Sequence, residues 1–427
     1  MKHFYLLLLF VVTVFRLSAQ DTLTVMHYNL LNYGNYTEYC TNSNNNHFNK
    51  EGYLRTILDY ISPQILTVNE ISNLNFYHER LLNEVLNTDG RSTYKRAPAT
   101  NTAGSDIINM LYYDTTILSL KSTTVIQSLV RDVDLYRLYF KNAAKLANGD
   151  TIYINCIIAH LKAGDSNQDE VKRGEMASNV INWLKDHAQP GNYLLMGDFN
   201  LYTSNEPAYQ TFTGVSADDF IFYDPLNMPG SWNNNPLFAS IHTQSVSNSG
   251  SGCQAGGGLD DRFDFILASD YIMEGSDDVI YKSGSYKAIG QDGLHFNQSV
   301  TNLPNNSVPS DVLDALGKMS DHLPVKLTLE VNAELPESIP ENDHFNNFSV
   351  YPLSGTEAVL QFDAVQRSSI EIRIYSIMGQ LLDIKHQESY TGKNKLKIDL
   401  KGLQKGFYLI VLSDNAGNSI TVKFIKS

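Results

Sequence analysis

Between residues 21 and 331, short apolar runs alternate with segments of helical periodicity. The runs are rich in Val, Ile, Leu, Tyr and Phe and are bounded by Asn, Gly, Asp or Pro, which is typical of β-strands. They cover residues 23–29, 65–70, 108–114, 134–140, 151–160, 193–198, 261–269 and 323–331. Helical periodicity is clearest over residues 51–61, 76–86 and 169–187. Because several strands follow one another directly, the pattern predicts an α+β fold with two packed sheets covered by helices, rather than a doubly wound parallel sheet.

The C-terminal part has a different pattern. Residues 333–345 are polar with two prolines and are predicted to be a linker. Six or seven short strands follow, with clean alternation at Ile370, Ile372 and Ile374. Residues 346–427 are therefore predicted to form a small, Ig-like β-sandwich. This part contains no cluster of reactive side chains, so we expect no catalysis there.

The first nineteen residues are predicted to be a cleaved signal peptide. Lys2 gives a cationic start, residues 4–15 are apolar, and small residues follow up to Ala19. A membrane anchor is the alternative, but it needs roughly 20 apolar residues and this run is shorter. A first folded domain then covers residues 20–332, with no further run long enough to span a bilayer.

Charge and cysteines limit the possible partners. The net charge is −14, and residues 21–334 carry 20 Lys and Arg against 36 Asp and Glu. Such an acidic body disfavours long-range attraction to nucleic acid, without excluding a local cationic groove or bound metal ions. Cys40 and Cys253 lie in polar loops and could pair after secretion, a question that the sequence leaves open. Cys156 lies in an apolar run and is predicted to be a buried free thiol.

Polar residues recur at the ends of the predicted strands, where a rigid sheet can display chemistry. Glutamate and aspartate are hard oxygen donors suited to Mg²⁺ or Mn²⁺, histidines can pass protons near neutral pH, and amides bind anions without adding charge. Together they suit hydrolysis of a phosphate ester. Taken singly, each is more often a turn former or a structural residue. The set is Asn29, Glu70, His160, Asp198, Asn200, Asp264, Asp321 and His322.

The motifs that carry these residues are HYNLLNYG, TVNEIS, IIAHLKAG, LMGDFN, DRFDFIL and MSDHLPV. In this order they resemble the endonuclease/exonuclease/phosphatase superfamily, which includes deoxyribonuclease I, abasic-site endonucleases, sphingomyelinases and inositol polyphosphate phosphatases. The resemblance covers residues 21–331 and implies a four-layer α/β sandwich with the site at one edge of two packed sheets.

The resemblance also implies roles for individual residues. Glu70 would be the main metal-binding carboxylate, with Asn29 and Asp321 nearby. Asp198 would orient or activate the attacking water, and Asn200 and Asn29 would bind phosphate oxygens. His322, paired with Asp264, and His160 would complete the catalytic set. The cofactor would be Mg²⁺ or Mn²⁺, with Ca²⁺ also open.

Two further matches and two departures concern the same site. Asp106 could brace His160, although a plain loop carboxylate is an equal interpretation, and Arg131 is favoured as a phosphate-binding arginine. Asn69 stands where the family usually has glutamine, so support for Glu70 could differ. The Trp-Cys-Asp-Arg signature of inositol polyphosphate phosphatases is absent, which lowers that alternative. His295 is interpreted as a structural loop histidine.

The C-terminal motifs FSVYP, IRIYSIMGQ and IDLKGLQKGFYLIVL resemble the type IX secretion sorting domain of Bacteroidetes, although Leu353 and Ser354 replace the usual Asn-Pro. The leading hypothesis is thus a secreted, monomeric, metal-dependent phosphodiesterase, with nucleic acid as the first substrate class and the type IX machinery as a partner. The alternatives are a sphingomyelinase-like or small-molecule phosphoesterase and a non-catalytic surface adhesin.

Overall fold

The structure is a computed structural model of the 427-residue chain. It describes residues 21–141, 146, 151–214, 220–331, 344–354, 357–376, 381–403, 406–415 and 418–426. The predicted signal peptide and most of the predicted linker lie outside these residues. The chain divides into two compact units, with the boundary between residues 333 and 334. Each unit is described by itself.

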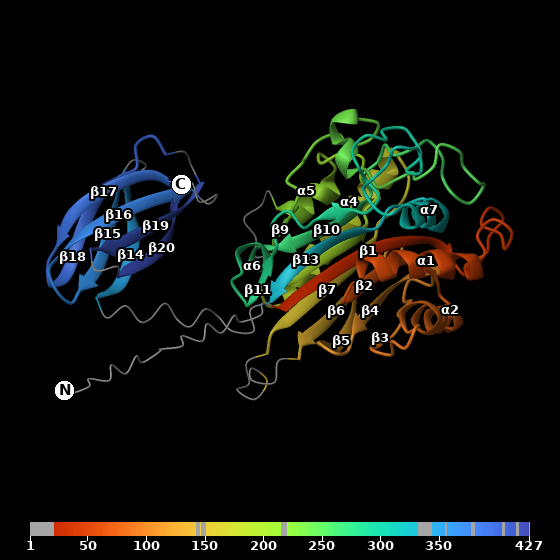
Figure 1. Cartoon of the computed structure of the whole chain (residues 1–427), viewed down its shortest axis with the longest axis horizontal. Helices are drawn as coiled ribbons and strands as arrows, with labels where there is room; N and C mark the ends of the chain where they lie inside the picture. Colours follow the sequence, from red (N-terminus) through yellow and green to blue (C-terminus); the bar gives the residue numbers. More distant parts are fainter. Residues whose placement is uncertain are drawn as a thin grey trace, which may run out of the picture. The chain divides into compact units, whose positions relative to one another are not determined.

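Two mixed sheets form the larger unit (Figure 1). The first sheet has the strand order β11 (Val279–Tyr281), β13 (Val325–Val331), β1 (Asp21–Tyr33), β2 (Ile65–Ser72), β4 (Ile107–Asp114) and β3 (Tyr94–Arg96), and β12 (Lys287–Ala288) pairs with β13. The second sheet has the order β5 (Leu118–Gln127), β6 (Val133–Phe140), β7 (Tyr153–His160), β8 (Tyr193–Asp198), β10 (Asp264–Ser269) and β9 (Phe222–Tyr223).

Alternating side chains of these strands point into different layers of the core. In β8, Leu194 and Met196 belong to the cluster between the two sheets, whereas Leu195 belongs to the cluster under the helices. In β1, Val25 faces the inter-sheet cluster and Met26 faces the outer one. Because both faces of the strands are buried, their sequences are nearly continuous apolar runs.

Helices cover the outer face of each sheet, which gives four layers and confirms the predicted fold class. On the first sheet lie α1 (His47–Ile61), α2 (Asn75–Arg80), the π-helical turn η1 (Leu81–Leu86) and α7 (Ser310–Met319). On the second lie α4 (Asn167–His187) and α5 (Pro207–Thr213). Short elements complete the unit: the 3₁₀ turn η2 (Pro236–Ile241) and α6 (Asp270–Glu274).

Two pairs of parallel strands position the site. β1 runs parallel to β2, with Asn29 opposite Asn69, and β7 runs parallel to β8, with His160 opposite Asp198. The carboxyl ends of parallel neighbours meet at one edge of a sheet. β10 runs antiparallel to β8 and places Asp264 opposite Asp198. Packing of the two sheets then brings both edges together.

The smaller unit is a sandwich of two antiparallel sheets. One has the order β14 (Phe345–Ser354), β15 (Glu357–Ala364) and β18 (Gly392–Asp399). The other has the order β17 (Leu381–Ser389), β16 (Ser368–Ser376), β19 (Gly406–Asp414) and β20 (Ser419–Lys426). The alternating residues predicted from the sequence, Ile370, Ile372 and Ile374, are buried in its core. In the described part of the chain, no helix has the length and apolarity needed to cross a membrane.

Candidate active site

Asn29, at the end of the regular part of β1, lies at the centre of the candidate site. Its Nδ2 donates to Glu70 Oε1 at 3.1 Å and to Asp198 Oδ2 at 3.0 Å, and it lies 3.5 Å from His322 Nε2. Its Oδ1 accepts from the Leu31 amide. This buried amide therefore joins groups that are up to 293 residues apart in the sequence.

Glu70 reaches the site through an irregular end of β2. Its φ is +58°, and the β1–β2 and β2–β4 registers both shift there. A left-handed conformation at a non-glycine residue is costly and tends to occur at functional sites. The backbone amide of Asn32 donates to Glu70 Oε2 at 3.0 Å, which fixes the second carboxylate oxygen.

Glu70, His160 and Asp198 form a compact group that could hold a metal ion. One ligand atom from each lies within 4.8 Å of the others. His160 Nε2 is 3.8 Å from Glu70 Oε1 and 3.6 Å from Asp198 Oδ2. The predicted metal set of Glu70, Asp321 and Asn29 shares only Glu70 with this group.

Burial controls the protonation of this group. It raises the pKa of the Asp198 carboxyl to about 7, aided by the carboxylates of Asp264 and Glu70 and opposed by His322. It lowers the pKa of His160 well below 6.5, and the positive charge of Arg131 acts in the same direction. In the absence of a cation, His160 is therefore neutral and its Nε2 can serve as a ligand.

His322 and Asp264 form the predicted pair. His322 Nδ1 lies 2.7 Å from Asp264 Oδ2 and both residues are buried. Although burial opposes the charged form, the carboxylates of Asp264 and Asp198 raise the pKa of His322 well above 6.5. His322 Nε2 is 3.7 Å from Asp198 Oδ2, so the cation and the carboxyl face one another.

Asp321 begins the segment that leads into β13 and faces the same centre. Its Oδ2 accepts from the Ala255 amide at 3.0 Å. Its buried Oδ1 lies 4.0 Å from His322 Nε2 and has no hydrogen-bond partner among the described residues. Buried oxygens are ordinarily satisfied, and a divalent cation would satisfy this one. Carboxylate oxygens and a neutral imidazole nitrogen are ligands that a divalent ion accepts, and Glu70, Asp198 and His160 offer them within 4.8 Å of one another.

The strand end that carries Asp198 depends on a glycine. Gly197 has a φ of +154°, and a Cβ there would lie 1.7 Å from the carbonyl oxygen of Ala159 on β7. The Asn200 amide donates to Asp198 Oδ1, and Asn200 adopts a φ of +51°. Phe199 points into the core, where its ring stacks on that of Phe265 at 5.1 Å. The close approach of the backbones explains the glycine beside the carboxylate.

The two looser matches have different outcomes. Arg131 Nη1 donates to the Leu161 carbonyl at 3.2 Å. Burial lowers the pKa of Arg131, and the carboxylates of Glu70 and Asp198 counteract this, so its charge faces the site. Asp106 is exposed, and among the described residues no hydrogen bond or ion pair joins it to His160. The structure thus brings Arg131 to the site but not Asp106.

Several polar residues at the site carry contacts that were not predicted from the sequence. Gln244 Nε2 lies 2.7 Å from His322 Nε2 and 3.4 Å from Asp321 Oδ2. Asn69 accepts from the Asp198 amide and donates to Asn109, which in turn donates to Asp134. Asn69, which replaces the family's usual glutamine, therefore supports Asp198.

A buried histidine lies beneath the site on β1. His27 Nδ1 is 3.0 Å from Thr67 Oγ1, and burial lowers the pKa of His27 to about 4. The sequence indicated a role for His27 only through its position two residues before Asn29, because alternate residues of a strand point to the same face of the sheet. His295, by contrast, pairs with Asp292 in its own loop.

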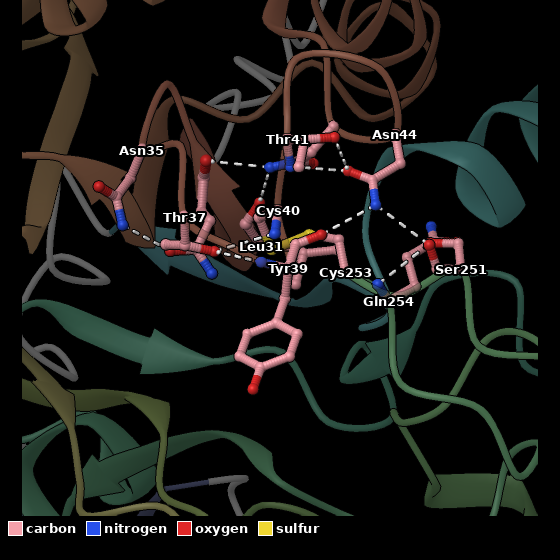
Figure 2. Close-up of a disulfide and its surroundings, with 12 residues drawn as sticks. Leu31, Asn35, Thr37, Tyr39, Cys40, Thr41, Asn44, Ser251, Cys253 and Gln254 are labelled. Atoms are coloured by element: carbon pink, nitrogen blue, oxygen red, sulfur yellow. Dashed lines mark hydrogen bonds between the residues drawn. A yellow bond between two sulfur atoms is a disulfide. The ribbon is translucent and has the colours of Figure 1, made fainter.

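The cysteines settle the question that the sequence left open. Cys40 and Cys253 form a disulfide across 213 residues, and Cys156 is a buried free thiol, as predicted. Figure 2 shows the disulfide between the loop that follows β1 and the loop that follows Gln244. These two loops border the candidate site.

The C-terminal unit matches a known family. Residues 349–427 match the secretion system C-terminal sorting domain. This confirms the sorting domain predicted from the C-terminal motifs, and it means that the protein is secreted or located at the cell surface. No curated protein sequence is significantly similar to the chain.

Several solved structures are similar to the chain. One is D. rerio TDP2 complexed with a single-strand DNA product, with 12% identity, a TM-score of 0.44 and coverage of 73% of this chain and 100% of that chain. Another is an endonuclease/exonuclease/phosphatase family protein from Bacteroides thetaiotaomicron, with 15% identity, a TM-score of 0.43 and coverage of 72% and 95%. An endonuclease/exonuclease/phosphatase from Beutenbergia cavernae has 11% identity, a TM-score of 0.42 and coverage of 95% and 99%.

Proposed function

We propose that the protein is a secreted phosphodiester hydrolase that depends on a divalent metal and uses water as its nucleophile. The observation that carries the proposal is the convergence of two carboxylates, two histidines and an amide from two sheets. Four of them lie on β1, β2, β7 and β8, and the fifth, His322, lies just before β13. Asn29, Glu70, His160, Asp198 and His322 meet there within a few ångströms. This combination suits attack on a phosphate better than acyl or glycosyl transfer, because each charge has a role on an anionic substrate.

Two side chains at the site can carry protons. Asp198 can accept a proton, and His322 is already protonated. With a pKa of about 7, the Asp198 carboxyl can take a proton from an attacking water near neutral pH. His322, kept cationic by Asp264, can stabilise the charge that develops on the phosphate oxygens. Arg131 adds a second positive charge, and the Asn29 amide adds a donor without charge.

The proposed cation would be held by Glu70 and Asp321, with His160 completing the set, which leaves the Asp198 carboxylate to activate the water. When bound, a divalent ion would neutralise phosphate charge and strengthen the electrophilic character of the phosphorus. The side chains of the protein orient the substrate and carry the protons.

An exposed group of aromatic side chains favours nucleic acid as the substrate. Phe48 and Phe76 are more than half exposed, and the guanidinium of Arg80 lies 4.7 Å from the first ring and 5.6 Å from the second. Phe48 lies at the start of α1 and Phe76 at the start of α2. These helices follow the strands that carry Asn29 and Glu70. Exposed rings flanked by arginine can stack on the bases of a single strand, which needs no long-range charge attraction.

A phospholipid head group or small phosphoester is the second candidate. The acidic body of the larger unit favours it, because such substrates carry less negative charge than a nucleic acid. Ionic strength separates the two candidates. Cleavage of DNA would weaken steeply as salt rises, whereas hydrolysis of a small phosphodiester would change little.

The test is a substrate panel with the purified full chain. Single- and double-stranded DNA, RNA, sphingomyelin and bis(p-nitrophenyl) phosphate would be assayed with Mg²⁺, Mn²⁺ or Ca²⁺, and again with a chelator. We expect metal-dependent cleavage, strongest on DNA, and a loss of about a hundredfold or more in His160→Ala and His322→Ala. His187→Ala, on the exposed end of α4, is the matched control. Full activity in His160→Ala or His322→Ala, or no hydrolysis of any substrate, would exclude the proposal.

We also propose that the chain acts as a monomer and leaves the periplasm through the type IX machinery. The C-terminal sorting domain supports this route. Removal of the sorting domain at the cell surface would then release the larger unit.

A further inference from the structure

The disulfide joins two loops that each hold one of the carboxylates proposed to bind the metal. The first loop, residues 34–46, connects β1 to α1, and the second, residues 247–257, follows Gln244. We name the two loops with their Cys40–Cys253 bond the disulfide brace.

The first loop fixes the turn that holds Glu70. Asn45 Nδ2 donates to the carbonyls of Leu31 and Asn32 at 3.0 and 3.1 Å, and Asn35 Nδ2 donates to Asn32 Oδ1 at 2.7 Å. Leu31 and Asn32 both have positive φ, so this turn is strained and needs such support. Asn32 then donates to Glu70 Oε2 from its backbone amide.

The second loop fixes Asp321. Its Ala255 amide donates to Asp321 Oδ2 at 3.0 Å, and Gln254 Nε2 donates to the Ser320 carbonyl at 3.4 Å. Ser320 Oγ in turn donates to the carbonyl of Asn29. The other Asp321 oxygen, Oδ1, is buried, lies 4.0 Å from His322 Nε2 and has no hydrogen-bond partner in the part of the chain that the structure describes.

Direct contacts between the loops are few. Besides the disulfide, Asn44 Nδ2 bridges the carbonyls of Tyr39 and Ser251 at 2.9 and 3.1 Å, as Figure 2 shows. The second loop contains four glycines and three serines and has little core of its own. Such a segment loses much conformational entropy when it becomes ordered. A covalent link therefore does much to hold it in one conformation.

We infer that the disulfide brace positions the carboxylates of Glu70 and Asp321 for one divalent cation, so that the metal site is complete only in the oxidised protein. This inference rests on the proposed metal-dependent function. The loss of a group that orients a metal ligand through a hydrogen bond typically weakens metal affinity by about 10- to 100-fold. Since disulfides persist outside the cytoplasm, the hydrolase would gain its metal site during export.

The disulfide can be reduced by a small dithiol. Dithiothreitol gives two electrons and two protons to the Cys40–Cys253 bond, which becomes two thiols, and the reagent closes to a cyclic disulfide. The free Cys156 thiol is buried and burial raises its pKa to about 12, so it does not compete.

The test is the Mn²⁺ dissociation constant of the full chain, measured by calorimetry. It would be compared in the oxidised protein, the dithiothreitol-reduced protein, the double variant Cys40→Ser/Cys253→Ser, and Asn44→Ala. Asn302→Ala, another exposed asparagine with a side-chain bond to Gln298, is the matched control for Asn44→Ala. Leu184→Ala, in α4, controls for lost stability, and melting temperatures are recorded for all forms.

We expect the Mn²⁺ dissociation constant to rise about tenfold or more in the reduced and double-serine forms, and less in Asn44→Ala. It should stay at the wild-type value in Asn302→Ala and Leu184→Ala, even where Leu184→Ala melts as low as the serine variant. Equal affinity in oxidised and reduced protein, an equal loss in Leu184→Ala, or no Mn²⁺ binding by the oxidised protein would overturn the inference. Metal binding without hydrolysis would contradict only the proposed function.

Discussion

Asp198 and His322 face each other at 3.7 Å, and their pKa values are both raised. The proposed reaction requires Asp198 to be deprotonated and His322 to be protonated. Burial raises the Asp198 pKa to about 7 without a bound cation, and a cation beside the carboxyl lowers that pKa, so the rate should increase with pH up to about neutrality. It should fall only at higher pH, where His322 loses its proton.

This prediction is checked by the pH profile of kcat/KM on bis(p-nitrophenyl) phosphate at saturating metal. In Asp264→Asn the descending limb should move to lower pH, because the main charge that keeps His322 protonated is gone. A profile that stays flat from pH 5 to 9, or a descending limb that Asp264→Asn leaves in place, would contradict these roles.

Gly197 carries a prediction about stability. In Gly197→Ala the new methyl group would collide with the Ala159 carbonyl on the neighbouring strand. We expect the melting temperature to fall by about 5 °C or more, since the strand pair β7–β8 must shift. Gly52→Ala, on α1 with open space around it, is the control and should melt at or above the wild-type value, because alanine favours a helix interior over glycine. A melting temperature of Gly197→Ala equal to that of the wild type would show that the strands can move apart freely.

The residues at strand ends could be predicted from the sequence because each follows an apolar run with a clear pattern. His160, Asp198 and Glu70 do so, and the structure brings them together. Gln244 could not be predicted, because it lies in a long loop and meets His322 only through the tertiary fold. Asp106 was predicted from its motif alone, and its exposure shows that position in a loop does not fix the direction of a side chain.

At the scale of elements, periodicity predicted most strands and three helices, with ends that differ by a few residues. Helix α1 begins at His47 rather than at 51 because Asn46 caps it by accepting from the Phe48 and Asn49 amides. The sequence pattern missed β5, whose serines and threonines are only partly buried. Helix α7 has the buried residues Val312, Leu316 and Met319 at helical spacing. Helix α7 could therefore have been predicted from the spacing of its apolar residues.

The exposed rings at the starts of α1 and α2 are predicted to contribute to substrate binding. Removal of the exposed rings in Phe48→Ala/Phe76→Ala should raise KM for single-stranded DNA about tenfold or more, because stacking contributes about 1–3 kcal/mol per base. Turnover of bis(p-nitrophenyl) phosphate, which has no bases to stack, should be unchanged. Tyr60→Ala, an exposed ring at the end of α1, is the control. An unchanged KM on DNA in the double variant would exclude base stacking at this surface.

At the scale of the whole molecule, the sequence predicted the division between an acidic α/β body and a neutral β-sandwich. The structure has two compact units, with the boundary between residues 333 and 334. Composition could not predict how the loops at the site are joined, because two cysteines in separate loops are compatible with either a disulfide or two thiols. Only the folded distances select the pair.

The sorting domain carries a prediction about location. A chain that stops before residue 346 should accumulate in the periplasm, because it lacks the unit that matches the sorting family. The full chain should appear at the cell surface or in the medium. Immunoblots of cell fractions measure this, with a periplasmic protein as the fractionation control. Surface delivery of the shortened chain would show that another segment directs export.

In the proposed reaction, water bound beside Asp198 attacks a phosphodiester at the edge of the two sheets. The most direct measurement is hydrolysis of DNA in H₂¹⁸O by the wild type and by Asp198→Asn, with the Mn²⁺ dissociation constant measured for both. We predict that one ¹⁸O enters each new terminal phosphate. We also predict that Asp198→Asn lowers kcat about a hundredfold or more in the folded, metal-saturated protein. Unlabelled phosphate, or a wild-type kcat in Asp198→Asn, would contradict the account.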